Sequence, residues 1–410
     1  MEDAKFLEVT LTTLTYGGDA MGRLADGRAV FVPFGLPGER VRVRLTDEKK
    51  NFARGEIIEI LESSPDRVSA KCKHFGECGG CHYQNLSYEK QLIAKTEILI
   101  DQFKRIGKIE NPPVKPMVAS PNPWNYRNHI QFSLNNAGKL GFQMPNSNRV
   151  VPITECHMPE SSINDFWGQL EFEPETNIER VSLRAGVDDD LLLVLESESP
   201  EPPELEIEAG ISIAHVYEEH TVVVAGNDYI IARVLDRDFK VSAASFFQVN
   251  TAMAEKMVQH LLTCLPVSLS TTLLDVYCGV GLFSAFFAPK CGRVIGIESS
   301  ESACEDFMVN LDEFDSVELY EGFAEEIIPH LEVKPDIVLV DPPRAGLDKQ
   351  VIDGILNLNP QVIAYVSCDP STLARDAARL INGGYKLKEV TPFDLFPQTY
   401  HIESISIFAR

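Results

Sequence analysis

Three segments near the C-terminus end in, or lead to, side chains that could do chemistry. VIAYVSC ends at Cys368, DIVLVD ends at Asp341, and Glu403 directly precedes SISIFAR. A thiolate can form a covalent intermediate, and a carboxylate can accept a proton. A lone cysteine is more often a buried structural residue, and a lone Glu is more often on the surface. The prediction of an active site therefore depends on all three side chains belonging to one sheet.

The surroundings of Cys368 and Asp341 favour this interpretation. Cys368 lies in SCDPSTLARD, where residues 371–380 have the pattern of a helix. The start of a helix stabilises a thiolate, so we expect a lowered thiol pKa. The two prolines after Asp341 supply no N–H donors and fix the local backbone. This predicts a rigid wall from which Asp341 points into a cleft.

A glycine-containing loop follows the first apolar segment of the same region. The sequence DVYCGVGLFS places Gly279 and Gly281 where a tight turn would bring backbone amides close to a ligand. A complete GxGxxG motif is absent, which argues against a dinucleotide. Glu298 ends the next segment, RVIGIE, about 20 residues later, where an acid can accept hydrogen bonds from ribose hydroxyls. The loop and Glu298 together predict a nucleoside cofactor.

Four of the nine cysteines are grouped in the N-terminal half of the chain. Cys72, Cys78 and Cys81 form a C-x5-C-x2-C triplet, and Cys156 is the only other cysteine outside the C-terminal region. In a cytosolic protein of this size, clustered cysteines indicate a metal centre or catalysis rather than disulfides. Four thiolates suit either a 4Fe–4S cluster or a structural zinc ion.

Hydrophobic periodicity divides the chain into three regions that must position these residues. Residues 1–63 alternate apolar and polar positions in about five short runs, which is typical of a small OB-like β-barrel. Residues 64–245 hold the four cysteines, an amphipathic helix at 85–109 and a β-rich series of segments. Residues 246–410 alternate strands with helices, the first at 251–264, which predicts a doubly wound, Rossmann-like sheet. The fold class is therefore multidomain α/β.

The net charge of −24 is unusual for a nucleic-acid-binding protein, because phosphate binding usually leaves a basic footprint. The acidic excess lies after residue 110 and includes PEPPELEIEAG, which we expect to be a surface loop. The most basic stretch runs from Arg23 to Arg54, in the barrel. No apolar run has the roughly 18–20 residues of a membrane helix, and no secretion signal is present. We expect a cytoplasmic protein without a membrane partner.

Together these motifs resemble the RNA uracil-5-methyltransferase family, in the branch that carries an iron–sulfur cluster. The resemblance covers the barrel, which is similar to a TRAM domain, the four cysteines, FFQVN at 246–250, DVYCGVG, DPPRAG, SCDPSTLARD and HIES. It implies a TRAM domain over 1–63, a central cluster domain over 64–245, and an S-adenosylmethionine-dependent methyltransferase domain over 246–410. The helix at 85–109 is implied to pack on the catalytic domain.

The resemblance also implies a role for each matching residue. Cys368 is the nucleophile that attacks C6 of uracil, and Glu403 is the base that removes the C5 proton. The contacts to S-adenosylmethionine include, besides the two glycines at 279 and 281, Gln248, Tyr277, Glu298 and Asp341. The ligands of a 4Fe–4S cluster are Cys72, Cys78, Cys81 and Cys156. Phe323 stands where the family tends to have an acidic residue near adenine, so that contact is not implied.

The expected product is 5-methyluridine in RNA, with 23S rRNA as the first choice and the T-loop uridine of tRNA as the second. DNA is not an expected partner, and we expect a monomer. Phe246 and Phe247 are candidates for stacking on the target base, and Arg127 and His129 for RNA contact. Two alternatives stay open. One is a non-catalytic RNA-binding cluster protein. The other is an amino-methyltransferase, which would not need Cys368.

Overall fold

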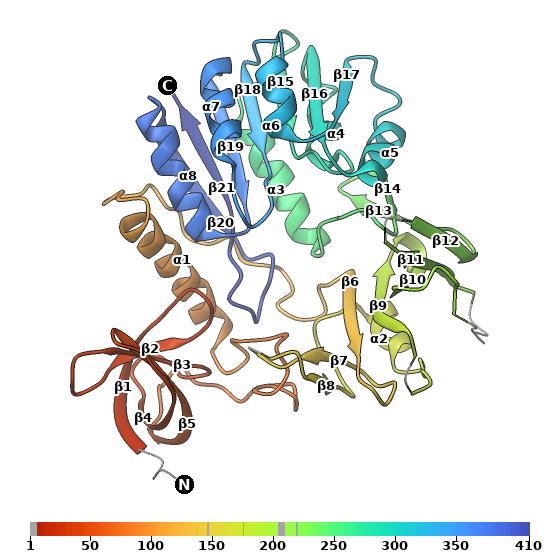
Figure 1. The fold of residues 1–410 in the computed structure, drawn as a ribbon. Coiled ribbons are helices and arrows are strands. Elements are labelled where there is room, and N and C mark those ends of the chain that lie inside the picture. The colour runs from red at the N-terminus through yellow and green to blue at the C-terminus, as the bar shows by residue number, and fades with distance from the viewer. Residues whose placement is uncertain (1–5, 146, 175, 204–209, 219) are drawn as a thin grey trace.

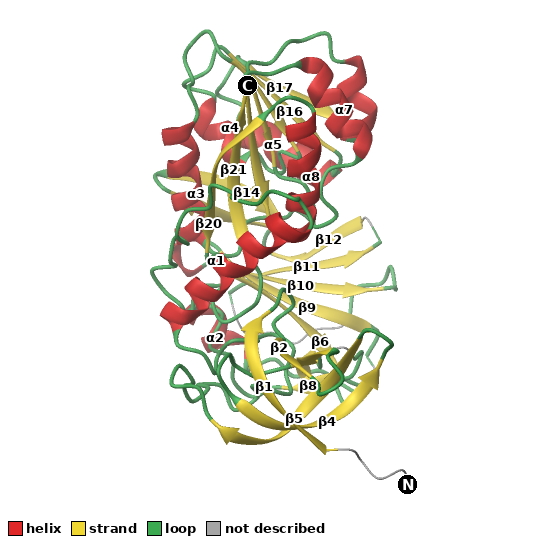
Figure 2. Cartoon of the chain, turned by 90° about the vertical axis from the view of Figure 1, so that its left-hand side faces the viewer, coloured by secondary structure: helices red, strands yellow, loops and turns green. Residues whose placement is uncertain are grey.

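The computed structural model describes residues 6–145, 147–174, 176–203, 210–218 and 220–410. The chain forms a closed barrel, a long helix, a seven-stranded central sheet and a second seven-stranded sheet (Figure 1). The barrel and most of the central sheet lie at one end of the molecule, and the second sheet with its helices lies at the other (Figure 2). The predicted multidomain α/β class is confirmed.

The N-terminal barrel consists of five strands that pair in the order β1-β2-β3-β5-β4. On the fourth strand, Val41 and Val43 are buried in the barrel, while Arg40 and Arg42 point outward, as the two-residue repeat of a strand requires. The predicted five-stranded barrel is confirmed. Its strands are β1 (Phe6–Leu14), β2 (Ala20–Arg23), β3 (Ala29–Val32), β4 (Arg40–Glu48) and β5 (Phe52–Glu62).

Much of the positive charge on the barrel is paired with carboxylates. Arg40 forms ion pairs with Glu8 at 2.8 Å and with Glu62 at 2.8 Å. Arg42 forms ion pairs with the same Glu8 at 3.3 Å and with Glu59 at 2.6 Å. The basic stretch that the sequence places here therefore presents less free positive charge to an RNA than its composition indicates.

Helix α1 (Tyr88–Arg105) runs between the barrel and the C-terminal sheet (Figure 1). It lies within the predicted range 85–109 and buries Leu99 and Phe103. Its Lys95 is completely buried, and the Lys95 Nζ atom lies 2.6 Å from Oδ1 of Asp394, which is also completely buried. Helix α1 is thereby fixed to the C-terminal part of the fold.

The central sheet has the strand order β12-β11-β10-β9-β6-β7-β8. Its core includes Phe132, Leu183 and Leu193, with Trp167 from a short helix packed against Phe132. The elements of this region are β6 (His129–Leu134), β7 (Leu140–Gln143), β8 (Val150–Pro152), α2 (Ser161–Trp167), β9 (Ile178–Ala185), η1 (Val187–Asp189), β10 (Leu191–Ser197), β11 (Ser212–Tyr217), β12 (His220–Ala225) and the separate hairpin β13 (Tyr229–Val234) and β14 (Arg237–Ser242).

The C-terminal sheet has the strand order β17-β16-β15-β18-β19-β21-β20, in which β17 to β19 are parallel and β21 is antiparallel to its neighbours. The strands are β15 (Thr272–Val276), β16 (Arg293–Glu298), β17 (Val317–Glu321), β18 (Ile337–Val340), β19 (Val362–Ser367), β20 (Lys386–Phe393) and β21 (Glu403–Ala409). The helices are α3 (Thr251–Cys264), α4 (Leu282–Phe287), α5 (Glu301–Asn310), α6 (Ala324–Ile327), η2 (Ile328–His330), α7 (Lys349–Leu358) and α8 (Pro370–Asn382).

The chain builds this sheet outward in one direction from β15 to β17 and in the other direction from β18, so the topological switch point lies between the parallel strands β15 and β18. In an open parallel sheet, such a switch point forms a crevice at the carboxyl ends of the strands, where ligands bind. The core strands are continuous apolar runs because both faces of the sheet are covered: β19 is buried at every position. The predicted Rossmann-like sheet is confirmed, and so is the predicted helix at 251–264.

Two further sequence expectations concern surface segments and membranes. Of PEPPELEIEAG, predicted to be a surface loop, residues 204–209 lie outside the described residues. Among the helices in the described ranges, none is both long and apolar enough to cross a membrane.

The buried Lys95–Asp394 pair gives a stability prediction. Lys95→Met should lower the free energy of unfolding by about 3–5 kcal/mol, because it leaves the carboxylate of Asp394 buried without its counter-charge. Lys90→Met is the matched control on the same helix. Lys90 forms a half-exposed ion pair with Asp66, and its loss should cost less than about 1 kcal/mol. Urea unfolding followed by circular dichroism measures both, and equal losses would contradict the prediction.

Candidate active site

Five of the predicted site residues follow one another along the carboxyl edge of the C-terminal sheet. Strand pairing places Val276 beside Ile297 and Val340, Val340 beside Tyr365, and Ser367 beside Ser404. The residues at the end of these ladders are therefore neighbours across the edge, in the order Glu298, Tyr277, Asp341, Cys368 and Glu403.

Cys368 directly follows the last residue of β19, and Glu403 is the first residue of β21. Because Ser367 pairs with Ser404, Cys368 and Glu403 come next along the antiparallel pair. Glu403 is 4% exposed, and Cys368 is partly exposed toward the edge. Burial and the charge of Asp341 raise the pKa of Glu403 well above its ordinary value, against the opposing effect of Arg344. Burial raises the pKa of Asp341 to about 7. The site therefore brings three acidic groups together where water solvates them poorly.

The structure differs from the sequence expectation on the state of the Cys368 thiol. Burial, followed by the charges of Glu403 and Asp341, raises the pKa of Cys368 to about 12. Helix α8 covers the predicted range 371–380 and extends from Pro370 to Asn382, but its N-terminus is already capped by Asp369. Asp369 accepts hydrogen bonds from the backbone N–H groups of Ser371 at 2.9 Å and Thr372 at 3.0 Å. Its carboxylate offsets the helix dipole that was expected to stabilise the thiolate.

The glycine loop after β15 is shaped by residues in the left-handed region. Tyr277 has a φ of 65°, Gly279 of 54° and Gly281 of 89°. A Cβ atom at Gly281 would lie 2.3 Å from Cδ1 of Leu311, so only glycine fits there, whereas nothing lies within 4 Å of a Cβ at Gly279. The loop thus leaves open space directly above its backbone, where a ligand can approach.

Glu298 is held at the end of β16 by backbone donors. Its Oε2 accepts a hydrogen bond from the N–H of Gly279 at 2.9 Å, and its Oε1 accepts from Ser299 at 2.7 Å and Ser300 at 2.9 Å. Phe323 follows β17 and is 57% exposed, and the preceding Gly322 donates its N–H to the carbonyl oxygen of Glu298 at 2.7 Å. Phe323, an aromatic residue, therefore follows the residue that is hydrogen-bonded to Glu298. The family tends to have an acidic residue at the position of Phe323.

The FFQVN segment lies between β14 and α3. Gln248 is 9% exposed, and its carbonyl oxygen accepts a hydrogen bond from Asn128 at 3.0 Å. Phe247 packs against Phe239, while Phe246 is 70% exposed. Of the two aromatic residues considered for base stacking, only Phe246 therefore has a free face.

The four N-terminal cysteines line one cavity at a distance from this edge, together with Arg127 and other residues. The backbone N–H of His74 points to Sγ of Cys72 at 3.4 Å, and that of Gly80 to Sγ of Cys78 at 3.4 Å. Within the described residues, no three of the four sulfur atoms all lie within 4.8 Å of one another. Thiolates around one zinc ion would lie roughly 3.8 Å apart. In this structure the four sulfur atoms are therefore spaced more widely than the ligands of a single zinc ion.

The expected RNA contacts at Arg127 and His129 do not fit their surroundings. Arg127 lies over the ring of Phe396 at 5.9 Å and faces the cysteine cavity. Burial lowers the pKa of His129 to about 3, and its Nε2 atom is buried without a hydrogen-bond partner among the described residues. Both side chains belong to the interior between the central region and the catalytic sheet.

Sequence reasoning missed two contributors to the site. Arg344 opposes the acidic groups by lowering the pKa values of Cys368 and Glu403, against the larger effects that raise them. Its place in DPPRAG, three residues after Asp341, was the available signal. Tyr16, from the barrel, donates its hydroxyl to Oδ2 of Asp369 at 2.8 Å. No local pattern indicates that contact, because it joins the two ends of the chain.

A parallel sheet with a switch point, a glycine loop after β15 and an acid at the end of β16 defines a Rossmann-like methyltransferase domain. The family model described as tRNA (Uracil-5-)-methyltransferase matches residues 211–410, and the TRAM domain model matches residues 4–58. A protein of Caldanaerobacter subterraneus, named an uncharacterized RNA methyltransferase, is 35% identical over 444 positions, covering 98% of each chain. The chain therefore belongs to this family of RNA methyltransferases and carries an N-terminal TRAM domain.

Two further comparisons extend over nearly the whole chain. A protein of Halalkalibacterium halodurans, also named an uncharacterized RNA methyltransferase, is 34% identical over 442 positions, covering 98% of this chain and 96% of that one. The crystal structure of the Pyrococcus abyssi tRNA (uracil-54, C5)-methyltransferase in complex with S-adenosyl-L-homocysteine has a TM-score of 0.74 and 26% identity. It covers 98% of this chain and 100% of that chain.

Alkylation of Cys368 tests the electrostatics of the site. Because its pKa is raised to about 12, the thiolate fraction is small at neutral pH and should rise about tenfold per pH unit up to at least pH 10. An ordinary thiol levels off near pH 9. Glu403→Gln removes a negative charge and should speed the reaction several-fold at pH 8, whereas Glu305→Gln, on the exposed face of α5, should not.

Reaction with iodoacetamide, followed by mass spectrometry of the peptide that contains Cys368, measures these rates. A rate that reaches a plateau near pH 9, or an equal rate in the wild type and the Glu403→Gln variant, would contradict the raised pKa.

Proposed function

We propose that this protein transfers a methyl group from S-adenosylmethionine to C5 of a uridine in RNA, with Cys368 as the nucleophile and Glu403 as the base. The observation that carries the proposal is that Cys368, directly after β19, and Glu403, at the start of β21, lie at one edge of the sheet, where the charges of Glu403 and Asp341 act on the Cys368 thiol. Family membership supports the reaction class. An amino-methyltransferase or a non-catalytic RNA-binding protein has no use for this pair.

The chemistry follows from the weak nucleophilicity of C5 in uracil. Addition of the Cys368 thiolate to C6 turns the ring into an enolate whose C5 is electron-rich. S-adenosylmethionine, when bound, supplies the methyl group that C5 attacks. Glu403 then accepts the proton from C5, and the bond between C6 and Sγ of Cys368 breaks to restore the aromatic ring. The target base must leave its stack to reach Sγ of Cys368. We assign the exposed ring of Phe246, in the FFQVN segment, to the side of the site that binds this base.

We assign the cofactor to the crevice between β15 and β18, in contact with Gln248, Tyr277, Gly279, Gly281, Glu298 and Asp341. The open space above Gly279 and the oriented carboxylate of Glu298 support this assignment. A sulfonium is positively charged, and the crevice edge carries several carboxyl groups. A cation beside Asp341 would lower the raised pKa values of Asp341, Glu403 and Cys368 together. Cofactor binding therefore favours the reactive ionic forms.

We further propose that Cys72, Cys78, Cys81 and Cys156 hold a 4Fe–4S cluster. Four thiols around one cavity, the two N–H groups directed at sulfur, and separations too wide for one zinc ion all fit such a group. The guanidinium of Arg127 borders the same cavity and would balance part of the negative charge of four thiolates. The reaction scheme needs no electron transfer, so we assign the cluster a structural role in shaping the central region for RNA.

Two RNAs are candidate substrates. We propose a uridine in 23S rRNA first, because the barrel combined with the cysteine cluster resembles the ribosomal branch of the family. The T-loop uridine of tRNA is the second candidate, and the likeness to the Pyrococcus abyssi tRNA (uracil-54, C5)-methyltransferase favours it. That likeness spans the entire chain, so the barrel by itself does not discriminate between the two.

The reaction is tested by incubating the protein with methyl-labelled S-adenosylmethionine and unmodified 23S rRNA or tRNA transcripts, followed by nucleoside mass spectrometry. Label should appear in 5-methyluridine of one RNA. Cys368→Ala should lose activity by at least a thousandfold, because the covalent route is closed. Cys291→Ala, at a buried cysteine after α4, is the matched control and should stay within about threefold of the wild type.

Glu403→Gln separates the two proposed roles. It should still form the bond to C6 but fail to remove the C5 proton, so an RNA–protein adduct should accumulate on denaturing gels. Absence of 5-methyluridine from both RNAs, with folded protein that binds the cofactor, would overturn the uridine assignment. Product formation by Cys368→Ala at the wild-type rate would overturn the nucleophile.

The cluster proposal predicts a separate loss. Cys72→Ser should lower the bound iron and acid-labile sulfide and weaken RNA affinity at least tenfold, while the affinity for S-adenosylhomocysteine changes less than twofold. Cys291→Ser serves again as the control. Full iron content in Cys72→Ser, or full RNA affinity in a variant that has lost its iron, would contradict the structural role.

A further inference from the structure

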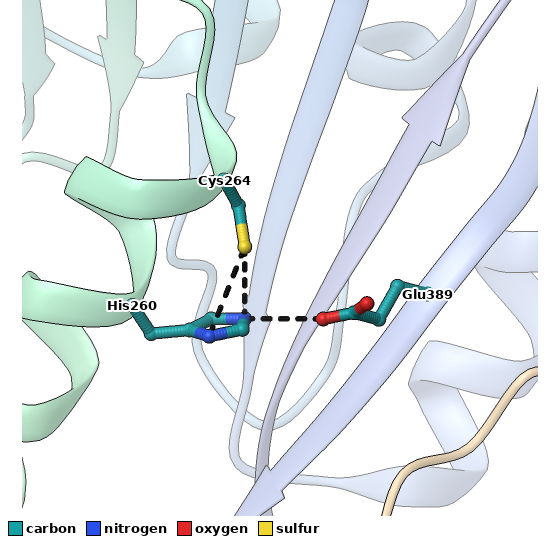
Figure 3. A group of neighbouring side chains, drawn as sticks. All are labelled: His260, Cys264 and Glu389. Carbon is teal, nitrogen blue, oxygen red and sulfur yellow. Dashed lines mark hydrogen bonds and ion pairs between the residues drawn. The ribbon is translucent and has the colours of Figure 1, made fainter.

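A second group of possible metal ligands lies away from both the active-site edge and the cysteine cavity. His260 and Cys264 are one helical turn apart at the end of α3, and Glu389 lies in the edge strand β20 (Figure 3). All three side chains are partly buried, and their ligand atoms all lie within 4.8 Å of one another. Among the described residues, this is the one group of three or more such side chains that is so close.

The separations match the ligand shell of one small ion. Nε2 of His260 lies 3.5 Å from Sγ of Cys264 and 3.7 Å from Oε1 of Glu389. Around a tetrahedral zinc ion, neighbouring nitrogen, sulfur and oxygen ligands lie roughly 3.4–3.6 Å apart, given Zn–S of about 2.3 Å and Zn–N of about 2.0–2.1 Å. One imidazole nitrogen faces both other donors, so a single ion can contact all three with little movement.

Neighbouring residues orient two of the three side chains. The Thr391 hydroxyl donates to Oε1 of Glu389 at 2.9 Å, and the His260 ring packs edge-on against Phe393 at 5.5 Å. Lys115 approaches the other carboxylate oxygen, Oε2, at 3.5 Å, which leaves Oε1 to face the imidazole. Such outer contacts are typical of metal sites, where they fix the direction of the ligands.

We propose that His260, Cys264 and Glu389 bind a zinc ion or a similar borderline divalent transition metal, with a water molecule as the fourth ligand. Mixed imidazole, thiolate and carboxylate donors select this class over magnesium or calcium, which prefer oxygen ligands alone. The alternative is a metal-free group in which His260 contacts Cys264 and forms an ion pair with Glu389, and zinc titration distinguishes the two.

The place of the site in the fold indicates a structural effect. Strand β20 is parallel to β19, since both are antiparallel to β21, so its first half lies at the amino edge, opposite the active-site edge. A metal ion there would cross-link α3 to the edge strand. In β20, Phe393 pairs with Glu403 of β21. The cross-link would therefore also restrict the motion of the strand next to the proposed catalytic carboxylate of Glu403.

Zinc binding to full-length variants tests the proposal. Each protein keeps the four N-terminal cysteines, is treated with EDTA, and is titrated with zinc against a chromophoric chelator. The wild type should bind one more equivalent of zinc than the variants Cys264→Ser, His260→Gln and Glu389→Gln. Each substitution should weaken the affinity for this additional zinc ion at least tenfold. Zinc should raise the melting temperature of the wild type and not of these variants. Cys291→Ser is the matched control and should behave as the wild type.

Three results would overturn the proposal. The first is equal zinc stoichiometry and affinity in the wild type and all three variants. The second is a loss in Cys264→Ser alone, which shows binding to an isolated thiol. The third is an equal loss in Cys291→Ser, which shows a general effect of removing a cysteine. Glu389→Gln preserves side-chain volume, so circular dichroism of that variant separates metal loss from misfolding.

Discussion

The arrangement of the active site depends on the buried charge pair of Lys95 and Asp394. Removing both charges from water costs several kcal/mol each. The 2.6 Å contact between Lys95 and Asp394 offsets that cost, together with a hydrogen bond from Lys95 to the Phe396 carbonyl oxygen at 3.0 Å. The pair fixes the first residue of the loop 394–402, which joins β20 to β21 and leads directly into Glu403. Gln91, one turn earlier on α1, adds hydrogen bonds to Gln398. A helix early in the chain therefore positions the loop that leads into Glu403, the residue proposed as the base.

The same loop is where the three regions of the chain meet. From the barrel, Tyr16 packs edge-on against Tyr400 at 5.7 Å while its hydroxyl holds Asp369, the neighbour of Cys368. From the cysteine segment, the N–H of His82 donates to the Gln398 carbonyl at 2.8 Å, and its ring packs on Tyr400. Contacts from the barrel and from the cysteine segment therefore converge on the loop that leads into Glu403 and on the residue next to Cys368.

The sequence predicted those strands that have a clear local hydrophobic pattern, and it did not predict features that depend on contacts between distant segments. Continuous apolar runs identify β15, β16, β18 and β19, because both faces of that sheet are buried. Strand β9, IERVSLRA, and edge strand β20, KLKEVTPF, were missed because charged residues interrupt their apolar positions. The sequence also did not predict which segments lie next to each other in the fold. The triad of His260, Cys264 and Glu389 exists only because β20 passes beside α3, and neither segment alone carries a metal motif.

The raised pKa values link cofactor binding to the reactivity of Cys368 under the proposed function. Burial and the charges of Glu403 and Asp341 raise the pKa of Cys368 to about 12, and burial and the charge of Asp341 raise the pKa of Glu403. A neutral thiol is a weak nucleophile, so the proposed reaction requires Cys368 to lose its proton. The positive charge of Arg344 lowers the pKa values of both groups, and its effect is smaller than that of burial. A positive sulfonium bound beside Asp341 would lower these pKa values further, so binding of the methyl donor would increase the thiolate fraction of Cys368.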